Sequence, residues 1–206
     1  MITLYTAATA NGQKAAIALE EAGLDYRTRT LDLAAGEHLD AALLALNPVG
    51  RIPFIEPDDG EGEAGAIVYG TLPIAVYAAE RSGRLLPANG PGRYAVLQWA
   101  AFAATDLGHV FANQFLMEEL VGTSDARVRE FIHSQIARML GTVEERLAES
   151  RFLAGDDYSI ADVLAYPTAA NSASRLPRRL QDYPHIRRWA EGIGQRPAVR
   201  RGMEAA

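Results

Sequence analysis

The spacing of hydrophobic residues changes at about residue 90 of this 206-residue chain. Before that point, short apolar runs typical of buried strands alternate with segments whose apolar residues recur every three to four positions, as in helices. These patterns predict strands at 2–5, 25–31, 49–56 and 66–69, and helices at 12–22, 38–46 and 71–82. Because a strand, a helix and a strand come first, we expect a parallel pair of strands joined by a right-handed crossover.

After residue 90 only helical periodicity remains. It predicts a long helix at 93–120 and further helices at 124–149, from Ser159 onward, and at 185–195. Segment 85–92 is rich in proline and glycine, which is typical of a linker. The pattern therefore predicts two domains, an α/β domain at 1–84 and an all-helical domain at 90–206.

One helix start carries its own signal. Ser159 and Asp162 have the spacing of a capping box, and Tyr158 precedes them as a candidate hydrophobic staple. We interpret this motif as a stabilising feature without chemistry.

Composition narrows the possible functions. The chain has no cysteine, which excludes structural disulfides, thiolate metal sites and a cysteine nucleophile, so that any thiol chemistry needs a sulfur from a ligand. A net charge of -6 argues against binding to nucleic acids or anionic membranes. No export signal or membrane-spanning run is evident, and we expect a cytoplasmic protein. Lys14 is the only lysine, which we attribute to codon bias.

Four motifs occur in a telling order: Thr-Ala-Asn-Gly-Gln-Lys at 9–14, Asn-Pro-Val-Gly-Arg-Ile-Pro at 47–53, Leu-Gln-Trp at 97–99, and Gly-Asp-Asp-Tyr-Ser-Ile-Ala-Asp at 155–162. In this order the chain resembles the glutathione transferase family, especially its bacterial Nu-class members with disulfide-bond reductase activity. The resemblance spans essentially the whole chain. It implies a thioredoxin-like N-terminal domain, a helical C-terminal domain, glutathione as co-substrate, and a homodimer.

The resemblance assigns the catalytic roles to Thr9 and Asn11, which match the Nu-class residues that meet the glutathione sulfur. A hydroxyl, an amide and the positive end of a helix would all favour the thiolate of a ligand whose thiol has a free pKa near 8.5. The alternative is that Asn11 only caps the helix. Tyr5, which lies inside the first strand, is expected to be a core aromatic.

The resemblance also implies the residues that bind glutathione. Pro53 would follow a cis peptide bond, and the main chain of Ile52 would pair with the cysteinyl part of the tripeptide. Thr71 would act as an N-cap near the γ-glutamyl carboxylate. His38 and Arg51 would hold the glycine end, where arginine suits a carboxylate. The alternatives are that Pro53 is an ordinary edge-strand proline and that His38 and Arg51 are ordinary surface residues.

Gly70 is where the sequence departs from the family, whose members usually carry glutamate there. Without that acid, the ammonium of the γ-glutamyl group loses its usual partner, and Asp106 of a second subunit is a candidate substitute. We expect Gly70→Glu to tighten glutathione binding, provided that the backbone does not require a positive φ.

The second substrate is expected in a pocket between the domains, lined by Phe102, Asp106, His109 and Phe111 of the long helix, although both phenylalanines could instead serve the core or a dimer contact. The leading function is a glutathione-dependent enzyme that conjugates electrophiles or exchanges disulfides. The alternatives are a non-catalytic binding protein of the same fold and an enzyme that uses a different thiol or ligand.

Overall fold

The computed structural model describes residues 1–57, 66–172 and 182–205. It contains two compact units, the first formed by Met1–Ala88 with Gln195–Ala206 and the second by Asn89–Gly194. No helix among the described residues has the length and apolar character needed to cross a bilayer.

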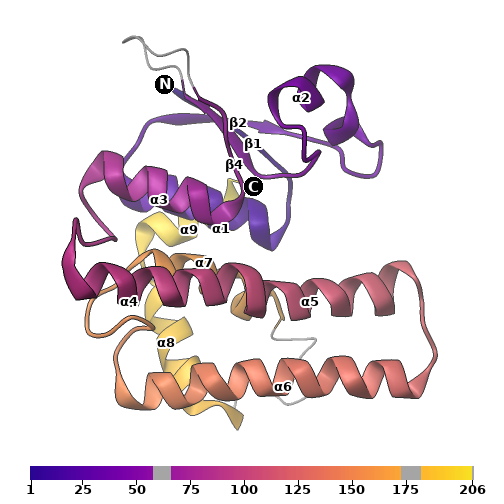
Figure 1. Cartoon of the computed structure of the whole chain (residues 1–206), viewed down its shortest axis with the longest axis vertical. Coiled ribbons are helices and arrows are strands. Elements are labelled where there is room, and N and C mark those ends of the chain that lie inside the picture. Colours follow the sequence, from indigo (N-terminus) through magenta and orange to yellow (C-terminus); the bar gives the residue numbers. More distant parts are fainter. Residues whose placement is uncertain (58–65, 173–181, 206) are drawn as a thin grey trace. The chain divides into compact units, whose positions relative to one another are not determined.

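The first unit is a four-stranded sheet with helices (Figure 1). Its strands are β1 (Ile2–Thr6), β2 (Tyr26–Thr30), β3 (Phe54–Pro57) and β4 (Val68–Tyr69), and its helices are α1 (Ala10–Ala22), η1 (Glu37–Leu39), α2 (Ala41–Leu46), α3 (Thr71–Ser82) and α9 (Pro197–Glu204). The strand order is β2-β1-β3-β4, with β1 and β2 parallel and the other pairs antiparallel. The expected parallel start and the thioredoxin-like α/β fold are confirmed.

The predicted helix at 38–46 is wrong as a single element. Asp40 has an extended backbone, with ψ of 139°, and it separates the 3₁₀ turn η1 from α2. Aspartate favours such boundaries because its side chain competes with the backbone for hydrogen bonds inside a helix.

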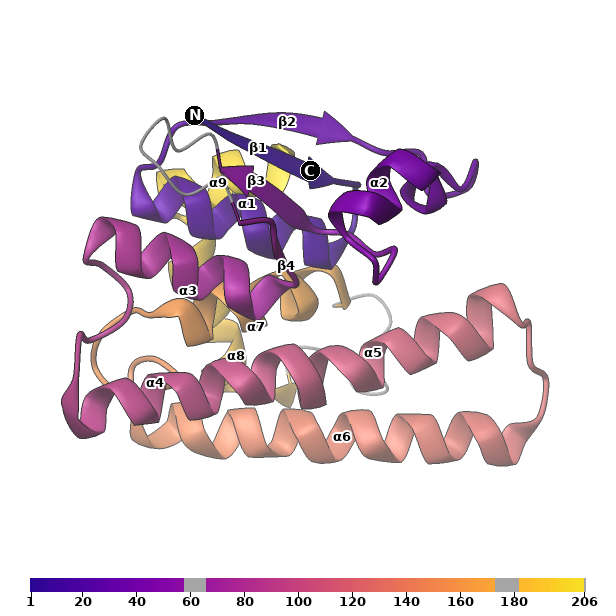
Figure 2. The same cartoon turned by 45° about the horizontal axis from the view of Figure 1, so that its top comes forward.

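The last helix, α9, packs against α1 within the first unit, whereas the sequence placed residues 195–206 with the helical domain (Figure 2). Gly202 makes this close approach possible, since a Cβ there would lie 2.6 Å from the backbone nitrogen of Ile17. Two ion pairs join the same helices, Arg196 with Glu21 and Arg201 with Glu20, each at 2.6 Å. Periodicity along the chain carries no information about such a distant partner.

The regular elements in the described part of the second unit are all helices, apart from an isolated bridge between Phe152 and Gly155. Its elements are α4 (Gly90–Ala101), η2 (Phe102–Leu107), α5 (Gly108–Gln114), η3 (Phe115–Leu120), α6 (Ala126–Glu149), α7 (Ile160–Ser172) and α8 (Pro184–Gly194). The predicted long helix is present as the continuous run 90–120, with η2 and η3 forming π-helical segments. The π segments were not predicted.

The capping box predicted before α7 is confirmed. The buried Asp162 accepts hydrogen bonds from the amide and hydroxyl of Ser159, at 3.1 and 3.2 Å. Its other carboxylate oxygen accepts from the amide of Leu153 at 3.0 Å and from the indole of Trp189 at 2.9 Å. Tyr158 packs edge-on against Phe152, with ring centroids 5.6 Å apart. One carboxylate thus joins the start of α7 to α8 and to the preceding loop.

Candidate functional site

The sheet register brings three predicted site segments to one end of the sheet. Tyr5 of β1 pairs with Phe54 of β3, and Phe54 pairs with Tyr69 of β4. The segment after β1, the segment before β3 and the segment after β4 therefore leave the sheet side by side, because neighbouring strands are about 4.8 Å apart. These segments hold 7–11, 50–53 and 70–71, which include most of the residues assigned from the sequence.

Thr9 is the N-cap of α1. Its side-chain oxygen accepts a hydrogen bond from the amide of Gly12 at 3.1 Å, and this leaves the hydroxyl hydrogen to be donated elsewhere. The alternative that Asn11 caps the helix is wrong, because α1 begins at Ala10 and Asn11 is its second residue. The amides of Ala10 and Asn11 have no acceptor inside the helix, as is usual in a first turn. The sequence did not identify these two donors.

Asn11 is exposed, and its side-chain oxygen accepts a hydrogen bond from the ammonium of Lys14 at 3.1 Å. Lys14 itself is only 1% exposed. Burial lowers the pKa of Lys14 to about 8. The sequence had shown Lys14 only as the single lysine of the chain, and its burial was not foreseen.

The Ile52–Pro53 peptide bond is cis, as the resemblance implied. Neither the amide nor the carbonyl of Ile52 has a hydrogen-bond partner among the described residues. The loop before it is held by the buried Asn47, whose side chain donates to the carbonyl of Arg51 at 2.7 Å and accepts from the amide of Val49 at 3.1 Å. Ile52 therefore presents a fixed, unpaired main chain, which suits pairing with an extended peptide.

Gly70 is bound to this loop, because its amide donates to the carbonyl of Pro53 at 3.1 Å. The prediction that Thr71 is the N-cap of α3 is wrong. Gly70 occupies the cap position with φ of 92° and ψ of 147°, and Thr71 is the first helical residue. The amides of Thr71 and Leu72 remain as donors at the helix N-terminus, where the helix dipole favours an anion. We expected Gly70→Glu to tighten glutathione binding only if the backbone does not require a positive φ. At a φ of 92° this condition is not met.

His38 lies in η1, whose end packs on the loop that carries Arg51. A Cβ at Gly50 would lie 3.0 Å from the side chain of Leu39 and 3.9 Å from the carbonyl of His38. The guanidinium of Arg51 is exposed and has no acceptor in the described part of the chain. The Nδ1 atom of His38 is buried without a hydrogen-bond partner. The guanidinium of Arg51 is thus available to a ligand, whereas the Nδ1 atom of His38 is covered.

Tyr5 is a core residue, as expected. It is stacked on Phe54 with ring centroids 4.2 Å apart, and its hydroxyl donates to Glu56 at 2.8 Å. Burial, followed by the neighbouring Glu56, raises the pKa of Tyr5. A hydroxyl that already donates to a carboxylate, and whose pKa is raised, is unsuited to activating a thiol.

The four residues predicted to line a pocket lie in η2 and α5 of the long helix, where Phe102 and Phe111 are half-buried and Asp106 and His109 are exposed. Phe102 is half-buried against Trp99 at 5.4 Å, in the π segment η2. Asp106 is exposed and accepts from the hydroxyl of Thr105 at 2.8 Å. The ring Nε2 of His109 is 3.1 Å from the side-chain nitrogen of Asn113. π-Helical turns inside α-helices often occur at functional sites.

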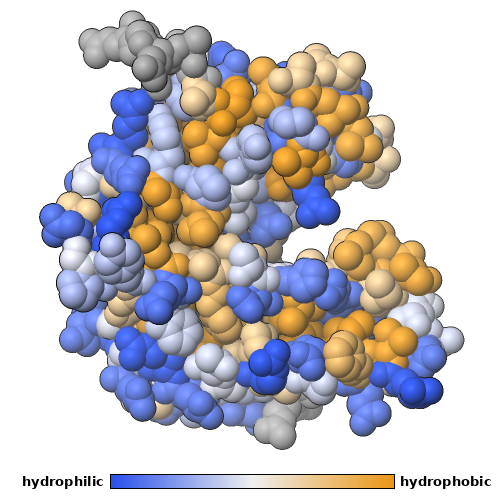
Figure 3. Space-filling model, in the orientation of Figure 1, coloured by the Kyte–Doolittle hydropathy of each residue, from blue (hydrophilic) through white to orange (hydrophobic). Residues whose placement is uncertain are grey.

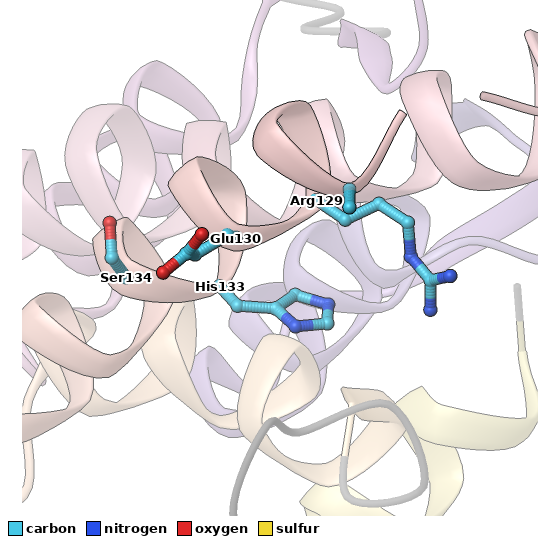
Figure 4. Close-up of a pocket in the computed structure, with 5 residues that line it drawn as sticks. Arg129, Glu130, His133 and Ser134 are labelled. Atoms are coloured by element: carbon cyan, nitrogen blue, oxygen red, sulfur yellow. The ribbon is translucent and has the colours of Figure 1, made fainter. Parts of the chain in front are cut away.

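The far end of the helical hairpin carries an exposed hydrophobic patch (Figure 3). We call it the hairpin patch; it consists of Phe115, Leu116, Met117, Leu120, Val121 and Phe131. Residues of α6 also line an open hollow of about 510 Å³. Figure 4 shows His133 and Arg129 on one side of this helix, and Glu130 and Ser134 turned away from them. His133 is already 2.9 Å from Glu118, and none of the predicted site residues lines this hollow.

Comparison with known proteins finds relatives that match nearly the whole chain. A family model described as glutathione S-transferase, N-terminal domain, matches residues 10–81, and one described as glutathione S-transferase, C-terminal domain, matches residues 125–192. Disulfide-bond oxidoreductase YfcG of Escherichia coli K12 is 31% identical, over 97% of this chain and 93% of the relative. Glutathione S-transferase 3 of Zea mays is 32% identical, over 95% of this chain and 89% of the relative.

A similar solved structure is that of a glutathione transferase family member from Pseudomonas fluorescens Pf-5 with two glutathione molecules bound. It has a TM-score of 0.91 and 28% identity, and the match covers 98% of this chain and 92% of that one. In the described residues of the present chain, no group of acidic residues, histidines or cysteines is arranged to hold a metal ion.

Proposed function

Because the chain belongs to the glutathione transferase family, we propose that it binds glutathione on its first unit and uses the glutathione thiolate as the nucleophile of a disulfide exchange or a conjugation. The observation that carries this proposal is the convergence of three segments at one end of the sheet. They supply the donors at the start of α1, the unpaired main chain of Ile52 and the N-terminus of α3.

This arrangement offers a partner to each part of glutathione except the γ-glutamyl ammonium. The cysteinyl main chain pairs with Ile52, and the thiolate accepts from the hydroxyl of Thr9 and the side-chain amide of Asn11. The γ-glutamyl carboxylate is placed at the start of α3, where Thr71 provides an amide. Arg51, assisted by His38, binds the glycine carboxylate.

Disulfide exchange needs two glutathione molecules, because the chain has no cysteine of its own. The first thiolate attacks one sulfur of the substrate disulfide, so that a mixed disulfide forms and one substrate thiolate leaves. The second thiolate then attacks the glutathione sulfur of the mixed disulfide, which releases glutathione disulfide and the second substrate thiolate. Two glutathione thiols are oxidised and one disulfide is reduced to two thiols. The relatives favour this reaction, since one is named a disulfide-bond oxidoreductase and another was solved with two glutathione molecules.

Conjugation is the alternative reaction at the same site, in which the thiolate attacks an electrophilic carbon. The maize relative, a glutathione S-transferase, supports it. We propose that Phe102, Asp106 and His109 contact the second substrate in either case. A non-catalytic binding protein, or an enzyme with a different thiol, is favoured only by Gly70, which stands where the family usually carries an acid.

A thermal-shift screen with glutathione, glutathione disulfide and other small thiols separates these functions. We expect a rise in melting temperature with glutathione and turnover of a small symmetric disulfide in a coupled assay. Turnover of a chloronitroarene without disulfide reduction would instead identify a conjugating enzyme. Binding without either turnover would identify a binding protein, and a response to another thiol alone would reassign the ligand.

Removing the hydrogen-bond donors at the start of α1 should destabilise the thiolate form of bound glutathione. We expect Thr9→Val and Asn11→Ala each to raise the pKa of bound glutathione by about one unit, because each removes a hydrogen bond to the anion. Ultraviolet absorbance of the thiolate, followed against pH, measures this value. Thr9→Ser keeps the hydroxyl and is the matched control. Unchanged titrations in both test variants would remove these residues from the catalytic site.

We also propose a cytoplasmic homodimer whose contact involves the long helix and α6. Tyr94 is 68% exposed on α4, and the hairpin patch is exposed at the other end of the long helix. Surfaces of this kind commonly mark protein contacts. Sedimentation at micromolar concentrations should therefore give twice the chain mass of 22.3 kDa. A monomer under these conditions would also end the proposal that Asp106 acts on the partner's γ-glutamyl ammonium.

A further inference from the structure

Lys14 is an unusual residue in the first unit. It lies one turn into α1 and is only 1% exposed. Fully buried lysines are rare unless they are paired with an acid. No carboxylate in the described residues forms an ion pair with Lys14, and its hydrogen-bond acceptor is the side-chain oxygen of Asn11 at 3.1 Å. A buried ammonium without an anion is costly, and this calls for a functional reason.

The acidic residues of α1 that are nearest to Lys14 in sequence form ion pairs with other residues. Glu20 and Glu21 pair with Arg201 and Arg196 of α9, so they do not neutralise the lysine. Consistent with an uncompensated charge, burial lowers the pKa of Lys14 to about 8, and the group is still mainly protonated at pH 7.

The contact also determines how the amide of Asn11 is oriented. An ammonium can only donate, whereas the asparagine amide has an acceptor oxygen and a donor nitrogen. The oxygen must therefore face Lys14, and the nitrogen, which has no partner among the described residues, is directed away from it. Since Asn11 is exposed, its amide would otherwise be free to rotate.

We infer that Lys14 is a positioning residue for the glutathione thiolate: its ammonium turns the amide nitrogen of Asn11 toward the sulfur and places a buried positive charge behind that amide. The inference rests on the proposed function, in which Asn11 donates to the sulfur. The thiolate then becomes the counter-charge that the folded chain does not provide. Asn11 contacts the sulfur, and Lys14 acts through it.

The test uses the full-length protein and glutathione itself. Lys14→Met removes the ammonium with a flexible side chain of similar length, and Lys14→Gln keeps a donor to Asn11 but removes the charge. We expect Lys14→Met to raise the pKa of bound glutathione by about one unit and to lower kcat, with a smaller change in KM. Lys14→Gln should fall between Lys14→Met and the wild type. Circular dichroism establishes that each variant is folded.

The same substitution in an Asn11→Ala background shows whether the lysine acts through Asn11. Coupled residues give non-additive effects, so Lys14→Met should then raise the glutathione pKa by clearly less. Equal effects in the two backgrounds, or an unchanged titration in both folded Lys14 variants, would overturn the role of Lys14 while leaving the proposed function intact. Failure of the wild-type protein to bind glutathione would overturn both.

Discussion

Asp162→Ala should lower the free energy of unfolding by about 3–5 kcal/mol, because it removes one acceptor from several buried donors at once. The side chain of Asp162 is fully buried. Its loss leaves the amides of Leu153 and Ser159 and the indole of Trp189 without their acceptor in a dry interior. Urea unfolding monitored by circular dichroism and by tryptophan fluorescence measures the change.

Two further substitutions calibrate this value. Asp162→Asn keeps one acceptor oxygen of the same shape and should lose less than the alanine variant. Ser159→Ala removes only the hydroxyl, which caps the amide of Ala161 and donates one of the hydrogen bonds to Asp162, and should cost about 1 kcal/mol. If Asp162→Ala cost no more than Ser159→Ala, the carboxylate would not be the link between α7, α8 and the preceding loop.

The elements bounded by strong local signals were predictable from the sequence. Helix α3 has the predicted bounds of 71–82 because glycines with positive φ, Gly70 and Gly83, stand on either side of it. Gly23 ends α1 in the same way, with φ of 70°. The helix start at Ser159 was predictable because a capping box lies within four residues.

Features that depend on distant partners were not predictable. The π segments η2 and η3 leave no periodicity different from that of an α-helix over so short a length. The position of α9 depends on Gly202 facing Ile17, which are far apart in the sequence. Chain periodicity reports which face of a helix is apolar, and not which element covers it.

In the candidate site, too, local motifs were predictable and features that depend on distant partners were not. The positions of Thr9, Asn11 and Pro53 followed from motifs, but the alternative that Asn11 caps α1 named the wrong residue, since threonine and asparagine both cap well. The burial of Lys14 was not foreseen because it depends on the elements packed around α1. The availability of the Ile52 main chain depends on where β3 begins, and strand ends are poorly marked in a sequence.

Gly70→Glu should destabilise the protein by about 3 kcal/mol and should not give the roughly tenfold gain in glutathione affinity that the carboxylate alone would provide. With φ of 92° and ψ of 147°, Gly70 has a backbone conformation that is essentially restricted to glycine. Space is not the obstacle, since an added Cβ would lie 3.5 Å from Pro73. Glutamate would instead relax the backbone, and glutathione binding would have to restore the strained form. Urea unfolding and calorimetric titration with glutathione measure the two effects.

Gly70→Ala separates the strain from the carboxylate, because it changes the backbone preference in the same way but adds no charge. We expect both variants to lose similar stability, and the glutamate variant to bind glutathione about tenfold more tightly than the alanine variant. Equal affinities in the two variants would show that the γ-glutamyl ammonium is paired elsewhere, and Asp106 would then be the residue to substitute next. An alanine variant as stable as the wild type would show that position 70 does not require glycine, so that the absence of the acid would need a reason other than backbone strain.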